Sequence, residues 1–274
     1  MKTLTESFKL NNGIEMPYLG FGTFKVPEGE IVIDATLEAL KVGYRHIDTA
    51  AVYKNEEGIG KAIKESGVSR QDVFLTSKVW NTDQGYDNAL RAFETSLKRL
   101  QTDYLDLYLI HWPKALNKET WKALERLYDE KVVRAIGVSN FKLHHLEEIM
   151  SGANVCPMVN QVEFHPQFPQ TGVLEFCKKN NIQLEAWSPL MQGKIFSIDL
   201  MKELADKYNK TISQIALRWD IQMGVVTIPK SITPERIKEN TEIFDFELSE
   251  EDMNKIAALN KEERIGPDPD NITF

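Results

Sequence analysis

The sequence has little of what marks an extracellular, membrane-bound or metal-binding protein. Only two cysteines occur in 274 residues, Cys156 and Cys177, and they do not form a CxxC pair. Zinc and iron–sulfur sites need closely spaced ligands, so we expect two reduced packing thiols and no bound metal. Residues 1–10 do not form an apolar leader, and no later apolar run is long enough to span a membrane. These absences predict a cytoplasmic protein without a membrane partner.

Basic charge is also scarce. The chain has 41 acidic and 33 basic side chains, a formal net charge of -8 and a pI near 5.3. A negative overall field repels polyanions, which argues against a nucleic-acid partner. Because 42% of the residues are hydrophobic and no repeat, linker or composition break occurs, we expect one globular domain over residues 1–274.

Short apolar segments recur along the chain, separated by longer segments with helical periodicity. In the first longer segment, Ile31, Ala35, Ala39 and Val42 share one helical face. Strands that alternate with helices pair in parallel through right-handed crossovers, which leaves a doubly wound sheet or a closed barrel. Eight candidate strands favour an α/β fold with a closed (β/α)8 barrel. These strands are expected at residues 18–22, 44–48, 73–79, 105–111, 132–139, 158–163, 182–188 and 225–229.

Some segments lie outside this alternation. Residues 8–10 and 14–16 flank Asn11-Asn12-Gly13, and the Asn-Gly pair suits the left-handed torsion angles of a tight hairpin turn. We therefore predict an N-terminal β-hairpin before the first barrel strand. Extra helices before strand 8 and at the C-terminus are expected at residues 200–208, 212–221 and 249–259.

Polar side chains gather where the predicted strands end, which is where a barrel of this kind carries its catalytic groups. Asp48 ends the second strand and leads to Tyr53, Lys78 stands near the end of the third, and His111 ends the fourth. Their chemistry fits carbonyl reduction, in which a proton donor must meet the charge that grows on oxygen. Tyr53 could supply the proton, and a neighbouring Lys78 cation would lower its pKa. Asp48 would hold Lys78, while His111 would orient the substrate oxygen.

A structural reading of the same residues is the alternative. Asp48 and Lys78 could form an ion pair that only stabilises the fold, Tyr53 could be a rim aromatic, and His111 could be a core histidine. For one residue alone that reading is preferable. The presence of all four at the ends of consecutive strands favours the catalytic reading.

A hydride donor is then required, and the segment after the eighth strand is the best candidate for binding one. Both Gly-x-Gly segments of the chain lack the third glycine of the dinucleotide fingerprint. After the eighth strand, however, Thr233-Pro234 can begin a helix beside Lys230, Ser231 and Arg236. Two cations at a helix start suit a phosphate monoester such as the 2′-phosphate of NADP. An ordinary capped helix with solvated charges is the alternative.

Other strand ends carry weaker signals. Ser139, Asn140 and Gln161 have hydroxyl or amide groups that could hold a carboxamide, although each could merely satisfy loop backbone. Trp187 could stack on a flat ring, although aromatic residues more often serve as packing.

Taken together, these motifs match the pattern of a known enzyme family. The chain resembles the aldo-keto reductases over nearly its whole length, through segments 43–50, 109–113, 136–141 and 228–231. The resemblance implies an NADPH-dependent reductase whose catalytic tetrad is Asp48, Tyr53, Lys78 and His111. It further implies a set of cofactor contacts, with Gly22 and Thr23 bordering the nicotinamide, Ser139, Asn140 and Gln161 on its carboxamide, Trp187 stacked on its ring, Ser188, Leu190 and Gln192 along the pyrophosphate, Lys230, Ser231, Thr233 and Arg236 at the 2′-phosphate, and Glu239 and Asn240 at the adenine.

The loops are short compared with those of vertebrate members, which usually have tyrosine at the position of Trp187. In both respects the chain is similar to the prokaryotic subgroup that includes 2,5-diketo-gluconate reductases and glyoxal or methylglyoxal reductases. We therefore expect an open mouth in which Trp80 and Trp112 contact small aldehydes and ketones, such as 2-oxoaldehydes and keto sugars. We also expect a monomer.

Two other functions remain as alternatives. A regulatory protein could keep the cofactor site and turn over little, but the intact tetrad argues against it. A metal-dependent barrel hydrolase could use Asp48, Glu163 and His165, but no second histidine or carboxylate cluster completes such a site.

Overall fold

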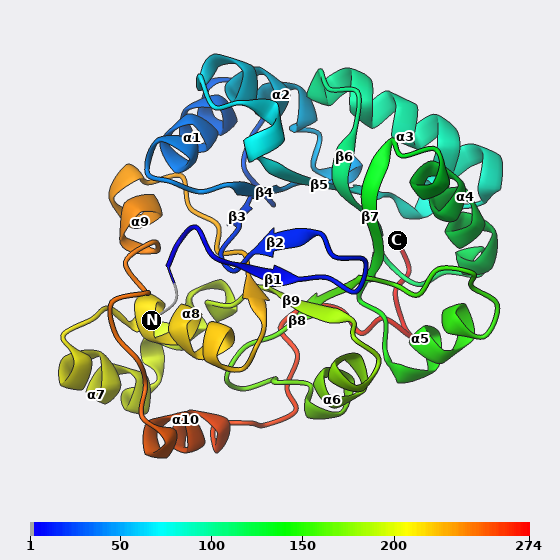
Figure 1. Cartoon of the computed structure of the whole chain (residues 1–274). Coiled ribbons are helices and arrows are strands. Elements are labelled where there is room, and N and C mark those ends of the chain that lie inside the picture. Colours follow the sequence, from blue (N-terminus) through cyan, green and yellow to red (C-terminus); the bar gives the residue numbers. More distant parts are fainter. Residues whose placement is uncertain (1–2) are drawn as a thin grey trace.

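A ring of eight parallel strands forms the centre of the computed structural model, which describes residues 3–274 (Figure 1). The strands are β3 (Phe21–Gly22), β4 (His46–Asp48), β5 (Phe74–Val79), β6 (Leu105–Ile110), β7 (Val133–Ser139), β8 (Val159–Glu163), β9 (Gln183–Trp187) and β10 (Val226–Thr227). Each strand pairs with the next along the chain. A parallel bridge between Leu19 and Thr227, and a bond from Gly22 N to Pro229 O at 3.1 Å, close the ring. The predicted barrel and its eight strands are confirmed.

Helices surround the ring and bury its outer face, which explains why the strands read as continuous apolar runs. All six residues of β6 are buried. The helices are α1 (Glu30–Lys41), α2 (Glu56–Glu65), α3 (Tyr86–Leu100), α4 (Asn117–Asp129), α5 (Leu143–Met150), α6 (Thr171–Lys179), α7 (Asp199–Tyr208), α8 (Ile212–Gln222), α9 (Pro234–Glu239) and α10 (Glu250–Ala257). Helices α7 and α8 before β10, and α10 near the C-terminus, confirm the extra helices.

The buried face of α1 differs from the expected one. Ala35 and Ala39 are buried as predicted, and Val42, the C-cap residue, is partly buried against the same core, but Ile31 is 46% exposed. Val32 packs inward in place of Ile31. Ile31 is the second residue of the helix, and the buried stripe begins one residue later, at Val32.

The predicted hairpin is present, but its turn is of another type. Strands β1 (Ser7–Lys9) and β2 (Glu15–Pro17) pair antiparallel. Of the three loop residues only Gly13 has a positive φ, 89°, so the prediction of a left-handed Asn-Gly pair is wrong. Leu10 N bonds to Ile14 O at 2.9 Å and Gly13 N to Leu10 O at 2.8 Å. This is a three-residue loop with glycine at the last, left-handed position.

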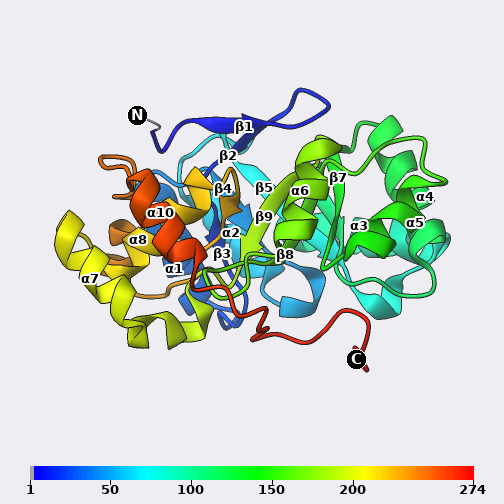
Figure 2. The same cartoon turned by 90° about the horizontal axis from the view of Figure 1, so that it is seen from below.

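The hairpin and the C-terminal tail lie at opposite ends of the barrel (Figure 2). Asn11 Nδ2 donates to Pro157 O at 3.2 Å and Asn12 Nδ2 to Arg134 O at 2.9 Å, so the hairpin covers the N-terminal ends of β7 and β8. The tail, residues 260–274, crosses the other end, where the strands finish. Within residues 3–274 no helix is long and apolar enough to cross a membrane.

Both cysteines are free thiols, as expected. Cys177 is buried in α6, and burial raises its pKa to about 12. Cys156 is half-buried in the loop before β8, and burial raises its pKa as well.

Candidate active site

The four side chains predicted to be catalytic come from the C-terminal ends of three neighbouring strands. Asp48 is the last residue of β4, Lys78 is the last but one of β5, and His111 follows β6 directly. Tyr53 ends η1 (Ala51–Tyr53), a 3-10 turn that follows β4. Parallel strands end at one rim, so the fold brings the four together.

Asp48 and Lys78 form a buried ion pair. The Lys78 Nζ lies 2.8 Å from each carboxylate oxygen of Asp48, and it donates a third bond to Thr49 O at 2.8 Å. The Lys78 side chain has no exposed surface and that of Asp48 is 3% exposed. Burial, the largest single effect, would lower the pKa of Lys78, but Asp48, Tyr53 and Glu185 together outweigh it and raise the pKa. The ammonium therefore stays charged at neutral pH.

Tyr53 lies beside this pair. Its ring centroid is 5.2 Å from Lys78 Nζ. Burial raises the pKa of Tyr53 to about 12, although Lys78 lowers it through its charge and a hydrogen bond. Lys78 thus acts in the predicted direction, but the net pKa does not fall below 10 as expected, because desolvation of the phenolate is the larger effect.

His111 completes the group. Its ring lies 5.7 Å from the Tyr53 ring and 5.1 Å from that of Trp80, measured between centroids, and both contacts are edge-to-face. Burial, followed by the Lys78 charge, holds the pKa of His111 well below its usual value, so the imidazole is neutral at pH 7. Its enclosed Nδ1 has no hydrogen-bond partner among the described residues.

The loop that carries Tyr53 is held by Asn55, a residue that sequence reasoning missed. The buried Asn55 side chain donates to Thr23 O at 2.9 Å and to Val26 O at 3.1 Å, and it accepts from Thr49 Oγ1 at 2.8 Å. An Asn just after a candidate acid was the available signal. Its partners, however, lie on another loop and are not predictable from spacing.

The residues predicted to hold a carboxamide are hydrogen-bonded to one another. Ser139 Oγ donates to Gln161 O at 2.8 Å, and Asn140 Nδ2 donates to Ser139 Oγ at 3.1 Å and to His111 O at 3.0 Å. Asn140 Oδ1 accepts from Trp187 Nε1 at 2.8 Å, which fixes the indole. Asn140 has a φ of 66°, a left-handed conformation that asparagine tolerates and that is found at functional strand ends.

The remaining predicted contacts lie around the same rim. Gly22 ends β3, and a Cβ there would lie 2.7 Å from Ile228 O, so only glycine fits. The buried Thr23 donates its hydroxyl to Asp48 O at 2.8 Å. Ser188 follows β9 with a φ of 58°. Leu190 is half-buried, and Gln192 is exposed in η4 (Met191–Ser197).

The predicted phosphate segment follows β10. Thr233 is the N-cap of α9 with Pro234 next, as expected, but its side chain makes no capping bond. Ser231 Oγ accepts from Thr233 N at 3.1 Å instead. Lys230 and Arg236 are exposed, and neither has an ion-pair partner within the described chain. Glu239 accepts from Thr211 Oγ1 at 2.7 Å, and Asn240 is 4% exposed.

With this geometry established, the chain can be compared with known proteins. Residues 18–261 match the model of the Aldo/keto reductase family. The chain belongs to this family. It is therefore an oxidoreductase that acts on carbonyl compounds, and the family uses a nicotinamide cofactor.

Similar members of the family are known from bacteria and from solved structures. The chain is 60% identical over 273 residues to glyoxal reductase from Bacillus subtilis (strain 168), and the alignment covers 99% of each chain. A crystal structure of MGS-M4, an aldo-keto reductase from a Medee basin deep-sea metagenome library, has a TM-score of 0.96, 51% identity, and covers 98% of this chain and all of the other. A mutant of Gox0644 in complex with NADPH has a TM-score of 0.93 and 42% identity, with 97% and 98% of the chains covered.

In this aldo/keto reductase, aromatic side chains border the mouth. Trp112 is 7% exposed, and its ring is stacked 6.5 Å from that of His111. Phe274 stacks on Trp80 at 5.8 Å between ring centroids and meets Trp112 edge-on at 5.5 Å. The sequence predicted the two tryptophans at the mouth, whereas the long-range contact from Phe274 had no local signal.

The tail that carries Phe274 is anchored by Glu163. The buried Glu163 carboxylate accepts from His165 Nε2 at 3.0 Å and from the backbone N–H groups of Ile265 and Gly266. A Cβ on Gly266 would lie 2.4 Å from the edge of Trp187, so the tail also packs closely behind that indole. Glu163 and His165 are thus committed to one another and to the tail, and Asp48 to Lys78, which argues against the metal-dependent hydrolase.

Acid should weaken this anchor. Burial alone would raise the pKa of Glu163, but the bonds from His165, Ile265 and Gly266 hold the pKa below its usual value. A lowered pKa in the docked state means that the stabilisation is present above about pH 4.3, the ordinary glutamate pKa, and is lost as the pH falls through the lower value. The substitution Glu163→Gln removes the same negative charge at neutral pH. At pH 7 the Ile265 and Gly266 amides should therefore exchange their hydrogens about tenfold faster in Glu163→Gln than in wild type.

The exposed Glu175→Gln on α6 is the matched control, and its tail amides should exchange as in wild type. Unchanged exchange in Glu163→Gln would show that the carboxylate does not anchor the tail.

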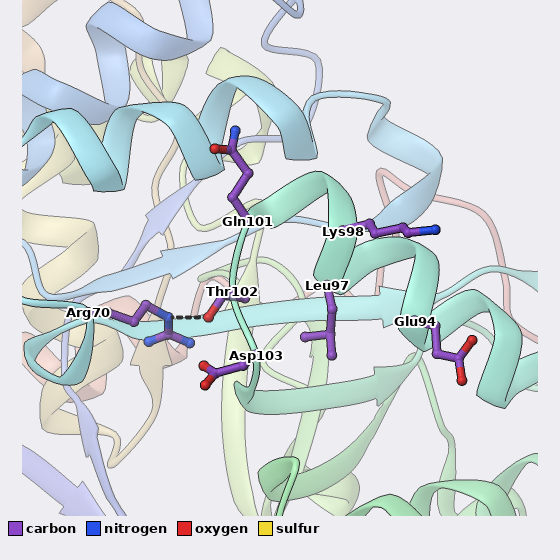
Figure 3. A pocket seen from close by; sticks show the side chains of 7 residues that line it. All are labelled: Arg70, Glu94, Leu97, Lys98, Gln101, Thr102 and Asp103. Carbon is purple, nitrogen blue, oxygen red and sulfur yellow. Dashed lines mark hydrogen bonds between the residues drawn. The ribbon is translucent and has the colours of Figure 1, made fainter.

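A cavity of about 680 Å³ lies away from these residues (Figure 3). It is lined by Arg70, Glu94, Leu97, Lys98, Gln101, Thr102 and Asp103. Arg70 lies in η2 (Arg70–Asp72), just before β5, so the cavity is near the N-terminal ends of the strands. The Arg70 guanidinium is already bonded to Thr102 and Asp106. No predicted site residue lines this cavity.

Proposed function

We propose that this aldo/keto reductase reduces small aldehydes and ketones with NADPH, and that Tyr53 donates the proton. The observation that carries the proposal is the buried Asp48–Lys78 pair beside Tyr53, with a neutral His111 in edge-to-face contact with the phenol ring. Bound NADPH supplies the hydride. Tyr53 then gives its hydroxyl proton to the oxygen as negative charge develops there, and Lys78 stabilises the phenolate that remains.

His111 acts by positioning. Because its imidazole is neutral, one ring nitrogen carries a hydrogen and can donate to the substrate oxygen without adding a charge. The rings of Trp80 and Tyr53 contact it edge-on and fix its plane. The carbonyl oxygen would thus receive two hydrogen bonds, one from Tyr53 and one from His111.

The protonation state of Tyr53 favours reduction. With its pKa raised to about 12, the phenol carries its proton throughout the neutral range, as an acid must. Alcohol oxidation would need the phenolate, which is scarce at pH 7. We therefore infer that reduction is the faster direction near neutral pH.

The residues of the rim fit NADPH. Lys230 and Arg236 are two exposed cations beside the start of α9 that have no ion-pair partner within the described residues. A phosphate monoester would supply the missing partner. Trp187 presents a flat indole fixed by Asn140, and Ser139 and Gln161 lie next to it. The Gox0644 mutant, a structural relative, was solved in complex with NADPH.

The mouth fits a small substrate. Trp80, Trp112 and Phe274 border it, and the chain is similar to a glyoxal reductase, which supports 2-oxoaldehydes such as methylglyoxal as substrates. Keto sugars are a second candidate class.

We also propose that the chain is one domain, 1–274, that works as a monomer in the cytoplasm and needs no metal, nucleic acid or membrane.

A substrate panel tests the proposal. Glyoxal, methylglyoxal, phenylglyoxal and a keto sugar would be offered with NADPH and with NADH, and NADPH oxidation would be followed at 340 nm as about 1 mM substrate is added. Turnover with NADPH is expected. Cofactor binding without turnover of any carbonyl would favour the regulatory alternative.

Arg236→Ala should change cofactor preference. Removing this guanidinium takes one charge-assisted contact from the 2′-phosphate, so the Kd for NADPH should rise about tenfold while that for NADH changes little. Fluorescence titration with both cofactors measures the two constants. Lys238→Ala on the same helix is the control, and its preference should match wild type. Equal weakening of NADPH and NADH in Arg236→Ala would place the arginine away from the phosphate.

A further inference from the structure

A second buried carboxylate, Glu185, lies in the barrel interior beside the Asp48–Lys78 pair. It belongs to β9 and faces Gln161 of β8 in register. It has no exposed surface. Sequence reasoning assigned it no role, although a glutamate in the middle of an apolar strand is unusual enough to be a signal.

Glu185 and Asp48 share one amide group. Gln161 Nε2 lies 2.8 Å from Asp48 Oδ2 and 2.8 Å from Glu185 Oε2. An amide nitrogen has two hydrogens, so both are used. Gln161 Oε1 receives no hydrogen bond from the described residues. Unlike the fully buried side-chain atoms that lack a partner, it keeps some exposed surface. The amide is therefore turned with its nitrogen toward the two carboxyl groups and its oxygen toward the rim.

This arrangement is costly for Glu185. Asp48 has the Lys78 ammonium as its partner, whereas Glu185 faces the His46 ring, whose Nε2 lies 3.5 Å from Glu185 Oε1. Burial, followed by Lys78, holds His46 neutral by lowering its pKa to about 3. Burial and the Asp48 charge raise the pKa of Glu185 to about 8. Leucine could fill this position without burying a polar group, which suggests that the carboxyl group serves the site.

We propose that Glu185 is a positioning residue that turns the Gln161 amide so that its Oε1 accepts a hydrogen bond from the amino group of the nicotinamide carboxamide. The inference rests on the proposed function, because it requires the cofactor at this rim. Glu185 itself touches neither cofactor nor substrate. Its Oε2 accepts a hydrogen bond from Gln161 Nε2 and so acts on the cofactor only through Gln161. Asp48 Oδ2 accepts the second hydrogen bond from Nε2, and the two bonds together fix the plane of the amide.

A cofactor analogue tests this directly. The 3-acetylpyridine analogue of NADP⁺ has a methyl group where the carboxamide has its amino group, so it cannot donate to Gln161. Wild type should bind NADP⁺ about tenfold more tightly than the analogue. In Glu185→Leu only the bond to Asp48 Oδ2 still holds the amide, so its plane is no longer fixed and the preference should fall to about twofold or less. Glu185→Gln keeps an acceptor oxygen of the same reach and should keep the preference.

Controls separate this role from general damage. Glu125→Leu removes a buried carboxylate on α4 that accepts from Asn154 N and Val155 N, far from the rim in the fold, and should keep the tenfold preference. If leucine at position 185 prevents folding, Glu185→Ala undergoes the same titration. The ratio of the NADPH and NADH constants, set by the phosphate segment, should be unchanged in every folded variant.

Two results would overturn the inference: an unchanged preference for NADP⁺ over the analogue in Glu185→Leu, or an equal loss in Glu185→Gln. Wild type that binds neither NADP⁺ nor NADPH would instead contradict the proposed function.

Discussion

Tyr53→Phe is expected to lose about 10²- to 10⁴-fold in kcat for carbonyl reduction while it binds NADPH as wild type does. Phenylalanine keeps the ring that contacts Phe24 and His111 but removes the only hydroxyl proposed to protonate the substrate oxygen. Because the change is made at the reacting atom, the effect should appear in kcat, with the NADPH affinity within about twofold of wild type. Single-turnover kinetics and a fluorescence titration measure the two.

The matched control is Tyr128→Phe on α4, which removes a phenol from the outer wall and should leave kcat unchanged. Full activity in Tyr53→Phe would eliminate Tyr53 as the acid. Loss of NADPH binding in that variant would show that the phenol supports the cofactor site instead.

Asp48→Ala is expected to cost about 3–5 kcal/mol in the free energy of unfolding, because it leaves the Lys78 ammonium buried without its counter-ion. Among the described residues, Thr49 O and the Tyr53 hydroxyl, both uncharged, would remain as partners of Nζ. Since the pKa of Lys78 is raised in the folded protein, the stabilisation is fully present below about pH 10.4 and is lost as the pH rises further. Urea unfolding at pH 7 therefore measures the whole effect.

An exposed pair gives the comparison. Lys202→Ala removes the partner of Asp199 on α7, where the side chains are 50% and 87% exposed, and should change stability by less than about 1 kcal/mol. An Asp48→Ala variant no less stable than Lys202→Ala would show that the buried pair contributes little to the fold. Activity should be lost in Asp48→Ala even where it stays folded, because Lys78 would lose its orientation toward Tyr53.

Much of the fold was predictable because the strands are buried on both faces and therefore differ in composition from everything around them. The same clarity extended to Asp48, Lys78 and His111, which follow directly from the rule that polar groups gather at the strand ends. Their positions at the ends of neighbouring strands predicted the Asp48–Lys78 ion pair, and the structure gives it two contacts of 2.8 Å.

Other properties depend on the balance of opposing effects or on contacts between distant residues, which the sequence alone does not reveal. The sign of the Tyr53 pKa shift is the balance between burial and the Lys78 charge, and only coordinates show that burial is larger. The predicted left-handed Asn-Gly turn was wrong because Asn12 uses its side chain to bind Arg134 O and Ile14 N, which suits a longer loop. The contact of Phe274 with Trp80 joins residues nearly 200 positions apart, so no local pattern could predict it.

The two thiols described above bear on how such an enzyme tolerates reactive carbonyl compounds. Electrophilic aldehydes form adducts with the thiolate and react far less with the protonated sulfur. Cys177 keeps its proton across the neutral range, and Cys156 lies in the loop before β8, at the hairpin end of the barrel. Aldehydes of the class proposed as substrates meet neither cysteine at the mouth, so hemithioacetal adducts with these thiols do not form at the rim where turnover is proposed.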